Sequence, residues 1–198
     1  MIKNIIFDMG NVLILFRPEI FINRLNVSQQ DAKLLNDVIF DSQEWASLDD
    51  GSANEAEVME IFKNKLPVRL HDQMITLVTQ WDIPLLEVEG MSQLIKELKA
   101  KGYKIYLLSN ASSRQHEYWD RISASEYFDG TVISADVKMV KPDPKIFEHL
   151  CEKFSLLPAE CFFIDDLEQH VIAAESIGIE GYVFDGNVSK LRQALERL

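Results

Sequence analysis

Five short apolar runs, rich in β-branched and aromatic residues, restrict the fold of this sequence more than any other feature. Most of them lack the polar–apolar alternation of a strand with one solvent-exposed face, so we expect both faces of these strands to be covered. Helical patterns lie between the later runs, and strands that alternate with helices form a parallel sheet. The sequence therefore predicts an α/β fold with helices on both faces of the sheet. The expected strands are residues 3–8, 104–109, 131–134, 161–165 and 181–184.

The helical patterns after residue 90 have recognisable ends. Asp143 has the position of a helix N-cap and Pro144 that of the first helical residue. Gly102 and Gly178 follow the last apolar residues of two other patterns, where a glycine typically ends a helix. These helices are the expected crossovers between the strands. They cover residues 92–100, 144–154 and 168–177.

A long segment without a strand interrupts the alternation. Residues 16–82 contain only helical patterns, for example 31–40 and 53–66, and carry 12 acidic and 6 basic side chains. A helical insertion at the carboxyl end of the first strand is well placed to cover whatever that end binds. We therefore expect a catalytic α/β core formed by residues 1–15 and 83–198, with the insertion as a helical cap.

The composition excludes several classes of protein. With 32 acidic and 20 basic residues, the net charge is −12, which argues against binding to nucleic acid or to anionic membranes. No apolar run approaches the length of a transmembrane helix, and the N-terminus does not resemble a signal peptide. Cys151 and Cys161 are too few for a disulfide framework and are expected to be reduced. We expect a cytoplasmic protein, as a monomer or weak dimer.

Carboxylates follow directly after two of the apolar runs. Asp8 comes after the first run, and Asp165 and Asp166 close the run that begins at Cys161. An ionised carboxylate at the end of a buried strand is costly unless something uses it. Because the carboxyl ends of parallel strands share one edge of the sheet, these three side chains are expected to meet there. Such carboxylates repel one another, and a hard cation such as Mg²⁺ would resolve the repulsion, whereas each Asp taken alone is also consistent with a helix or turn cap.

Two more polar segments follow expected strands. Ser109 and Asn110 end one strand, and a hydroxyl and an amide with backbone N–H groups behind them suit a phosphate oxygen, although such a pair also commonly caps a helix. Lys141 precedes Pro142, whose ring restricts the backbone and so holds the lysine in place. A fixed ammonium beside a carboxylate cluster would neutralise a phosphoryl group. An ordinary surface lysine is the alternative.

In their order along the chain, these segments resemble the four motifs of the haloacid dehalogenase-like (HAD) hydrolase superfamily, and the resemblance covers essentially the whole chain. Those motifs are an Asp after a hydrophobic strand, a Ser or Thr that ends a strand, a Lys often followed by Pro, and paired acids after a strand. The matching residues are Asp8, Ser109, Lys141 with Pro142, and Asp165 with Asp166. The resemblance implies a Rossmann-like, HAD-like core with a small all-helical cap.

The resemblance also implies a reaction and a metal. Asp8 would be the nucleophile and form an aspartyl-phosphate that water later hydrolyses. Mg²⁺ would be held by Asp8, the backbone carbonyl of Gly10 and Asp166. Asp165 would bind the ion directly or through a water molecule. The implied activity is that of a Mg²⁺-dependent phosphoric monoester hydrolase acting on a small phosphorylated metabolite.

By the same resemblance, Ser109, the backbone at Asn110 and Lys141 would bind the oxygens of the transferring phosphoryl group. The catalytic residues implied are then Asp8, Lys141 and Ser109. The metal and the lysine would supply opposite charge, and the strand ends would supply rigid positioning.

Two positions depart from the family pattern. Phosphatases of this family usually have a second Asp two residues after the nucleophile, as general acid and base, and here that residue is Gly10. Either a cap side chain or water substitutes for it, or the leaving group is a good one, or turnover is slow. The cap offers four candidates, among which the sequence does not choose, and the last of them is expected to be a plain exposed histidine. They are Glu44, Asp49, Asp50 and His71. The family's usual Asn after the fourth motif is His170 here, which either supports the site or faces solvent.

The first motif, with Gly10, Asn11 and Val12, resembles a branch of capped members that includes sugar-phosphate phosphatases of the α-glucose-1-phosphate phosphatase type. An anomeric hydroxyl is a better leaving group than an ordinary alcohol, which would reduce the need for a general acid. Arg114, just beyond the second motif, is expected on a solvated helix face, with contact to a substrate phosphate as the alternative. Trp81 and Trp119 are expected to pack in the core or cap.

Three other functions remain to be separated from this one. A 2-haloacid dehalogenase would use the Asp8 carboxylate on carbon and would need no Mg²⁺, which the paired acids and Lys141 disfavour. A phosphomutase would also want an acid–base group at position 10. A sensor that binds a phosphorylated metabolite without turnover is the alternative from a different class.

Overall fold

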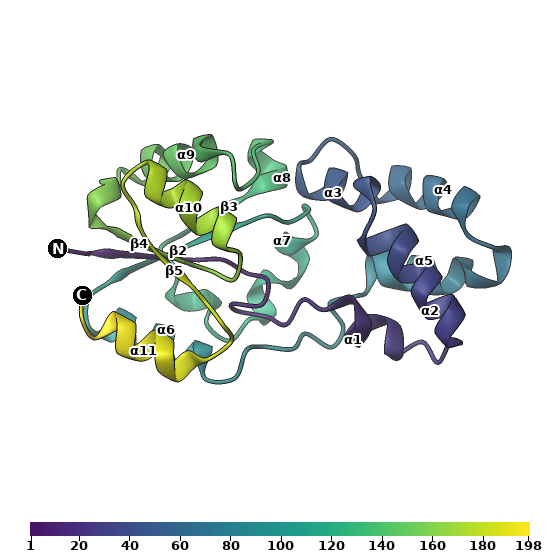
Figure 1. The fold of residues 1–198 in the computed structure, drawn as a ribbon, viewed down its shortest axis with the longest axis horizontal. Coiled ribbons are helices and arrows are strands. Elements are labelled where there is room, and N and C mark those ends of the chain that lie inside the picture. The colour runs from purple at the N-terminus through teal and green to yellow at the C-terminus, as the bar shows by residue number, and fades with distance from the viewer.

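The computed structural model describes all 198 residues. All five strands are parallel and form one sheet in the order β3-β2-β1-β4-β5 (Figure 1). The first strand therefore lies at the centre, with the second and fourth as its neighbours. This topology confirms the predicted α/β fold. The strands are β1 (Asn4–Phe7), β2 (Lys104–Ser109), β3 (Gly130–Ile133), β4 (Cys161–Asp165) and β5 (Glu180–Val183).

The predicted strands are confirmed with shifts of one residue at several ends. The third begins at Gly130, which pairs with Tyr106 of β2, and ends at Ile133, so that Ser134 already belongs to a helix. The fifth strand, at the edge of the sheet, is only partly buried, whereas β1 and β4 are buried throughout. The acid-bearing strands are thus the central ones.

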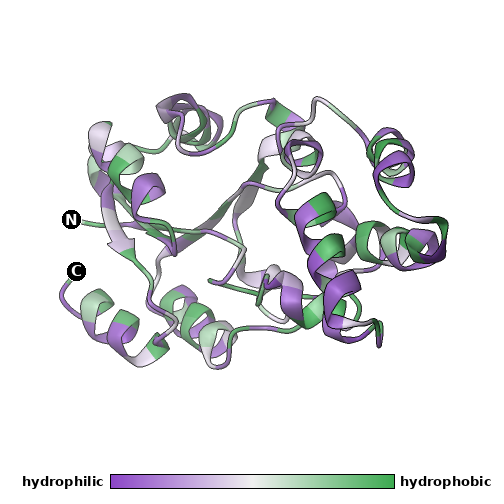
Figure 2. Cartoon of the chain, turned by 45° about the vertical axis from the view of Figure 1, so that its right-hand side comes forward, coloured by the Kyte–Doolittle hydropathy of each residue, from purple (hydrophilic) through white to green (hydrophobic).

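Helices cover both faces of the sheet, with α6 and α11 on one side and α9 and α10 on the other (Figure 1). The turns of these helices alternate between hydrophobic and hydrophilic stretches (Figure 2), as expected for helices with one face on a core. Asp143 caps α9 by accepting a hydrogen bond from the N–H of Lys145, as the sequence predicts. The helices after β2 are α7 (Gln115–Tyr118), α8 (Ser134–Val137), α9 (Pro144–Phe154), α10 (Glu168–Ser176) and α11 (Val188–Leu195); α6 (Met91–Ala100) precedes β2.

The segment between β1 and α6 is helical, as the sequence predicts. Its helices lie beyond the carboxyl ends of the strands, while both chain termini lie at the opposite end of the sheet (Figure 1). They are α1 (Pro18–Asn23), α2 (Gln29–Leu35), α3 (Gln43–Asp49), α4 (Glu55–Lys65) and α5 (His71–Thr79). Short 3-10 or π turns occupy Asn36–Phe40, Val68–Leu70, Trp119–Arg121, Ser125–Tyr127 and Pro158–Glu160.

Two hydrophobic clusters account for the packing. Ile6 of β1 points to the cluster under α9 and α10, whereas its neighbours Ile5 and Phe7 point to the other face. The cluster that contains Ile5 and Phe7 continues from its face of the sheet into the helical insertion. The insertion is therefore packed on the core rather than tethered to it. None of the helices is both long and apolar enough to cross a membrane.

Candidate active site

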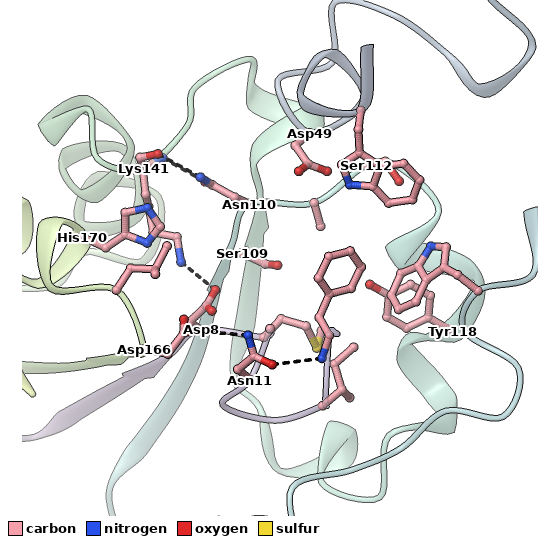
Figure 3. A pocket seen from close by; sticks show the side chains of 18 of the residues that line it. Asp8, Asn11, Asp49, Ser109, Asn110, Ser112, Tyr118, Lys141, Asp166 and His170 are labelled. Atoms are coloured by element: carbon pink, nitrogen blue, oxygen red, sulfur yellow. Dashed lines mark hydrogen bonds and ion pairs between the residues drawn. The ribbon is translucent and has the colours of Figure 1, made fainter. Parts of the chain in front are cut away.

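Three side chains meet where the three central strands end. The register pairs Phe7 of β1 with Leu107 of β2 and with Ile164 of β4. The next residue along β1 and β4 is therefore an aspartate in each, Asp8 and Asp165. Ser109, the last residue of β2, is 1% exposed and faces the same edge (Figure 3). The sheet register thus brings together residues more than 150 positions apart in the sequence.

Lys141 lies at the centre of this group. Its Nζ donates hydrogen bonds to Asp8 Oδ1 at 2.6 Å, to Asp165 Oδ2 at 2.7 Å and to the carbonyl oxygen of Leu108 at 3.0 Å. The side chain is only 1% exposed. Burial opposes the charge of the ammonium, but the two carboxylates together raise its pKa above the ordinary value. The structure therefore excludes the alternative of a surface lysine.

The three acids form a site that could hold a divalent cation. One oxygen each of Asp8, Asp165 and Asp166 lies within 4.8 Å of the others. Burial raises the pKa of Asp8, and the charge of Asp165 adds to the rise, which Lys141 opposes. Burial also raises the pKa of Asp166. Carboxylate oxygens are the ligands that Mg²⁺ prefers, and a doubly charged ion would offset the cost of these buried charges, so the donor set fits Mg²⁺.

Asp165 and Asp166 are each held by a neighbouring polar side chain. His170 is buried, and its Nδ1 lies 3.0 Å from both carboxylate oxygens of Asp165. Of the two roles that the sequence leaves open for His170, the structure supports the one within the site. Asn11 donates from Nδ2 to Asp166 Oδ2 at 3.1 Å, and its Oδ1 accepts the N–H of Phe16. This role of Asn11 was not predicted from the sequence. Asparagine is one of the few residues that adopt the left-handed backbone conformation found here, with φ of 53°.

Asn110 fixes the loop that carries Lys141. Its Nδ2 donates to the carbonyl oxygen of Lys141 and its Oδ1 accepts the N–H of the same residue, both at 2.8 Å. The amide side chain therefore acts as a bridge between the end of β2 and the lysine loop. From the sequence, the amide and the backbone of Asn110 were expected to serve a phosphate oxygen. The contact of its side chain with Lys141 could not be predicted, because it depends on the relative position of two distant loops.

Replacing Asn110 with alanine is expected to lower the free energy of unfolding by about 1–3 kcal/mol, because two hydrogen bonds in a partly buried position are lost. Urea unfolding followed by circular dichroism would measure the change. Asn64→Ala, which removes a single exposed contact within α4, is the matched control and should cost less than about 1 kcal/mol. Equal losses in the two variants would show that Asn110 does not bridge the loops.

A cavity of about 440 Å³ opens between the strand ends and the helical insertion (Figure 3). The strand-end side is polar. The opposite side is largely aromatic and includes Trp81, which the sequence predicts only as a packing residue of the core or cap. Its lining includes Asp8, Gly10, Asn11, Ser109, Asn110, Lys141, Asp166 and His170 on the polar side, with Phe16, Trp45, Trp81 and Tyr118 among the aromatic residues and Asp49 from α3.

Of the four acid–base candidates in the insertion, only Asp49 lines this cavity. Glu44 pairs with Lys65 away from it, and Asp50 accepts the N–H of Ser52 at the end of α3. The expectation of an exposed His71 is wrong: this residue is half-buried, and its Nε2 lies 3.1 Å from the carbonyl oxygen of Lys63, where it closes the end of α4. The structure thus singles out Asp49 among the four candidates, which the sequence alone could not do.

The expectation of a solvent-exposed Arg114 is also wrong. It is 9% exposed instead of lying on a solvated helix face. Its guanidinium donates through Nε and Nη2 to Glu55 of α4, and through Nη1 to Glu117 at 3.0 Å. Because Arg114 follows β2 and Glu55 belongs to the insertion, this ion pair links the two parts of the chain. The sequence could not indicate it, since the partner lies 59 residues away.

Comparisons with known proteins agree with this arrangement. The chain is 28% identical over 187 residues to sesquiterpene phosphatase astK of Aspergillus oryzae, covering 90% of this chain and 88% of that protein. It is 27% identical over 180 residues to phosphorylated carbohydrates phosphatase of Thermotoga maritima, covering 89% and 82%. A HAD family enzyme from Bacteroides thetaiotaomicron, solved in complex with magnesium and inorganic phosphate, has a TM-score of 0.74 and 25% identity, covering 96% of this chain and 99% of that one. The family model of the haloacid dehalogenase-like hydrolases matches residues 2–178, and the chain therefore belongs to this family.

Proposed function

We propose that this protein is a Mg²⁺-dependent phosphatase that hydrolyses a small phosphorylated metabolite through an aspartyl-phosphate on Asp8. The observation that carries the proposal is the buried Lys141, held between Asp8 and Asp165 at the carboxyl edge of the sheet. A fixed cation next to three acids is the charge arrangement expected for a site that binds both a metal ion and a phosphoryl group. The phosphatases among the relatives and the magnesium and phosphate in the Bacteroides structure support the same reaction.

Asp8, Asp166 and the backbone carbonyl of Gly10 would hold Mg²⁺, with Asp165 as a further ligand or as the partner of a bound water. When bound, the ion shields the attacking carboxylate from the negative phosphate and stabilises charge in the transition state. Asn11 and His170 orient Asp166 and Asp165, respectively, through the contacts described above.

The phosphoryl group would bind between Asp8, Ser109, the backbone at Asn110 and Lys141. Asp8 attacks phosphorus through one carboxylate oxygen, while Lys141 neutralises the equatorial oxygens and Ser109 donates its hydroxyl to one of them. Because Asn110 fixes the lysine loop, the ammonium keeps its place through the reaction. Residues 16–82 act as a cap that closes the cavity over the leaving group and excludes water.

For the organic part of the substrate we propose a sugar phosphate, which the resemblance to the α-glucose-1-phosphate phosphatase type and the Thermotoga relative both favour. Aromatic side chains such as Trp45 and Trp81 can stack on the C–H face of a sugar. A specific observation favours a second class, the phosphate of an apolar alcohol: the cap side of the cavity is mainly aromatic, and astK is named as a sesquiterpene phosphatase.

Phosphate release is expected only with Mg²⁺ present and should be lost in excess EDTA, because three clustered acids without the ion repel the substrate. The measurement is phosphate release from p-nitrophenyl phosphate, a sugar-phosphate panel and a phosphorylated terpenoid alcohol. Re-addition of Mg²⁺ after EDTA should restore the rate, and Ca²⁺, which tolerates looser geometry, should support it poorly.

The same assay separates the alternatives. Binding of a sugar phosphate without turnover of any ester would favour a phosphometabolite sensor and contradict the proposal. Fluoride release from fluoroacetate in EDTA, without phosphatase activity, would favour a 2-haloacid dehalogenase. The esters that turn over fastest relative to their KM would decide between the two substrate classes.

A further inference from the structure

We propose that Asp49, on α3 of the cap, is the general acid and base of the reaction, in place of the aspartate that position 10 lacks. This inference rests on the proposed phosphatase function and goes beyond it, because it gives the cap a chemical role as well as a covering one. The carboxyl group of Asp49 lines the same cavity as Asp8 but comes from the opposite side (Figure 3).

The position of Asp49 suits the leaving group. In an in-line displacement, the leaving oxygen lies across phosphorus from the attacking oxygen of Asp8. That direction points away from the strand ends and towards the cap, where Asp49 lies. A proton donor on the cap side therefore faces the atom that needs the proton.

The backbone of Asp49 is anchored to the core. Its carbonyl oxygen accepts a hydrogen bond from the hydroxyl of Ser134, a fully buried residue at the start of α8. Two residues further on, Gly51 lies so close to the core that a Cβ there would stand 2.4 Å from the carbonyl oxygen of Ala135. The cap is thus packed tightly on the core beside Asp49, which gives its carboxyl group a defined place over the site.

The protonation of Asp49 also suits an acid–base group. Burial, with the charge of Asp50 as a second cause, raises the pKa of Asp49 to about 7. The groups that act on this carboxyl are Asp50, at the C-cap of α3, Tyr118 on α7 and the backbone N–H of Ser112, which opposes the rise. A pKa near the working pH allows one group both to give and to take a proton.

The other titratable groups that line the cavity have different tasks or the wrong acidity. Asp8 and Asp166 belong to the acid cluster, Lys141 is paired with two carboxylates, and His170 is in contact with Asp165. Burial, with smaller contributions from nearby acids, raises the pKa of Tyr118 far above its ordinary value, so its hydroxyl is a poor donor. Asp49 is the group that remains.

The proposed steps balance. As an oxygen of Asp8 bonds to phosphorus, the bond from phosphorus to the ester oxygen breaks, and that oxygen keeps the electron pair and takes the proton of Asp49. The alcohol leaves. Water then attacks the phosphorus of the aspartyl-phosphate, gives a proton to the Asp49 carboxylate, and the bond to Asp8 breaks. The products are the alcohol and inorganic phosphate, with both aspartates restored.

Asp49→Asn tests the proposal through two esters. On glycerol phosphate, whose alkoxide needs a proton, kcat/KM is expected to fall by about 10²–10⁴-fold, the usual contribution of general acid catalysis. On p-nitrophenyl phosphate, whose leaving group needs little help, the rate of aspartyl-phosphate formation, measured as a burst, should stay within about threefold. The activity of the wild type on glycerol phosphate should decline as the pH rises above about 7, because Asp49 loses its proton. The variant should lack this decline, which is the basic limb of the pH profile.

Two further variants sharpen the test. Asp50→Asn, outside the cavity, should keep activity on both esters but move the limb to lower pH, because the charge that raises the pKa of Asp49 is gone. Gly10→Asp has room for a side chain, since a Cβ there would meet nothing closer than 3.7 Å. In the Asp49→Asn background it should restore at least about tenfold on glycerol phosphate.

Equal losses on both esters, or no loss on either, would overturn the role of Asp49. Should Asp49→Asn fail to fold, the wild-type pH profiles still decide: a limb near pH 7 on the alkyl ester alone supports the proposal, and identical profiles on the two esters contradict it. Absence of Mg²⁺-dependent hydrolysis of either ester by the wild type would instead contradict the phosphatase function itself.

Discussion

Asp8→Asn is expected to lower kcat on every phosphate ester by at least about 10⁴-fold, the scale of loss seen when a covalent nucleophile is removed. The amide cannot attack phosphorus, so no aspartyl-phosphate forms. The cavity itself should persist, because Asn has nearly the volume of Asp and Lys141 keeps its contacts with Asp165 and the carbonyl oxygen of Leu108. The variant should therefore stay folded while its catalytic activity is lost.

The measurement is steady-state phosphate release, together with a search for acid-stable phosphate on the quenched protein. The wild type should carry covalent phosphate that hydroxylamine releases, and Asp8→Asn should carry none. Asp185→Asn is a matched control, since Asp185 also follows a strand of the sheet but is exposed and paired with Lys190. Covalent phosphate or a comparable rate in Asp8→Asn would show that another group is the nucleophile.

The fold could be predicted because its information is local. Continuous apolar runs indicate strands buried on both faces, and helices between them require parallel crossovers, so the layer arrangement followed from residues that are neighbours in the sequence. Several strand ends differ from the prediction by one residue. At Gly130, for example, hydrogen bonding to β2 decides where the third strand begins.

The polar half of the site could be predicted for a related reason. Asp8, Ser109 and Asp165 each end a strand, and one rule of parallel sheets places strand ends at one edge. The contacts of Lys141 with Asp8 and Asp165 agree with that expectation.

The cap half could not be predicted from the sequence. Whether Glu44, Asp49, Asp50 or His71 reaches the cavity depends on how five helices pack on the core and on one another. Helical periodicity says which face of a helix is apolar but not what that face contacts. The Arg114–Glu55 pair was missed for the same reason, because it joins two segments whose relative position only the tertiary structure defines.

Lys141→Met is expected to damage both stability and activity. In EDTA the free energy of unfolding should fall by about 3–5 kcal/mol, because Asp8 and Asp165 keep their buried charges but lose their shared cation. With Mg²⁺ present, kcat/KM should fall by about 10²–10³-fold, the loss typical of removing one charged donor from a transition state. Urea unfolding and phosphate release would measure the two effects.

Magnesium separates the two roles of Lys141. The ion binds only the folded protein, so it stabilises that state in proportion to its affinity, and removing a neighbouring positive charge tightens its binding. Mg²⁺ should therefore recover more stability in Lys141→Met than it adds to the wild type, yet it should leave most of the activity lost. Lys145→Met, an exposed lysine at the start of α9, should change unfolding by no more than about 0.5 kcal/mol. Equal stabilisation of both proteins by Mg²⁺ would contradict a site shared by the lysine, the acids and the ion.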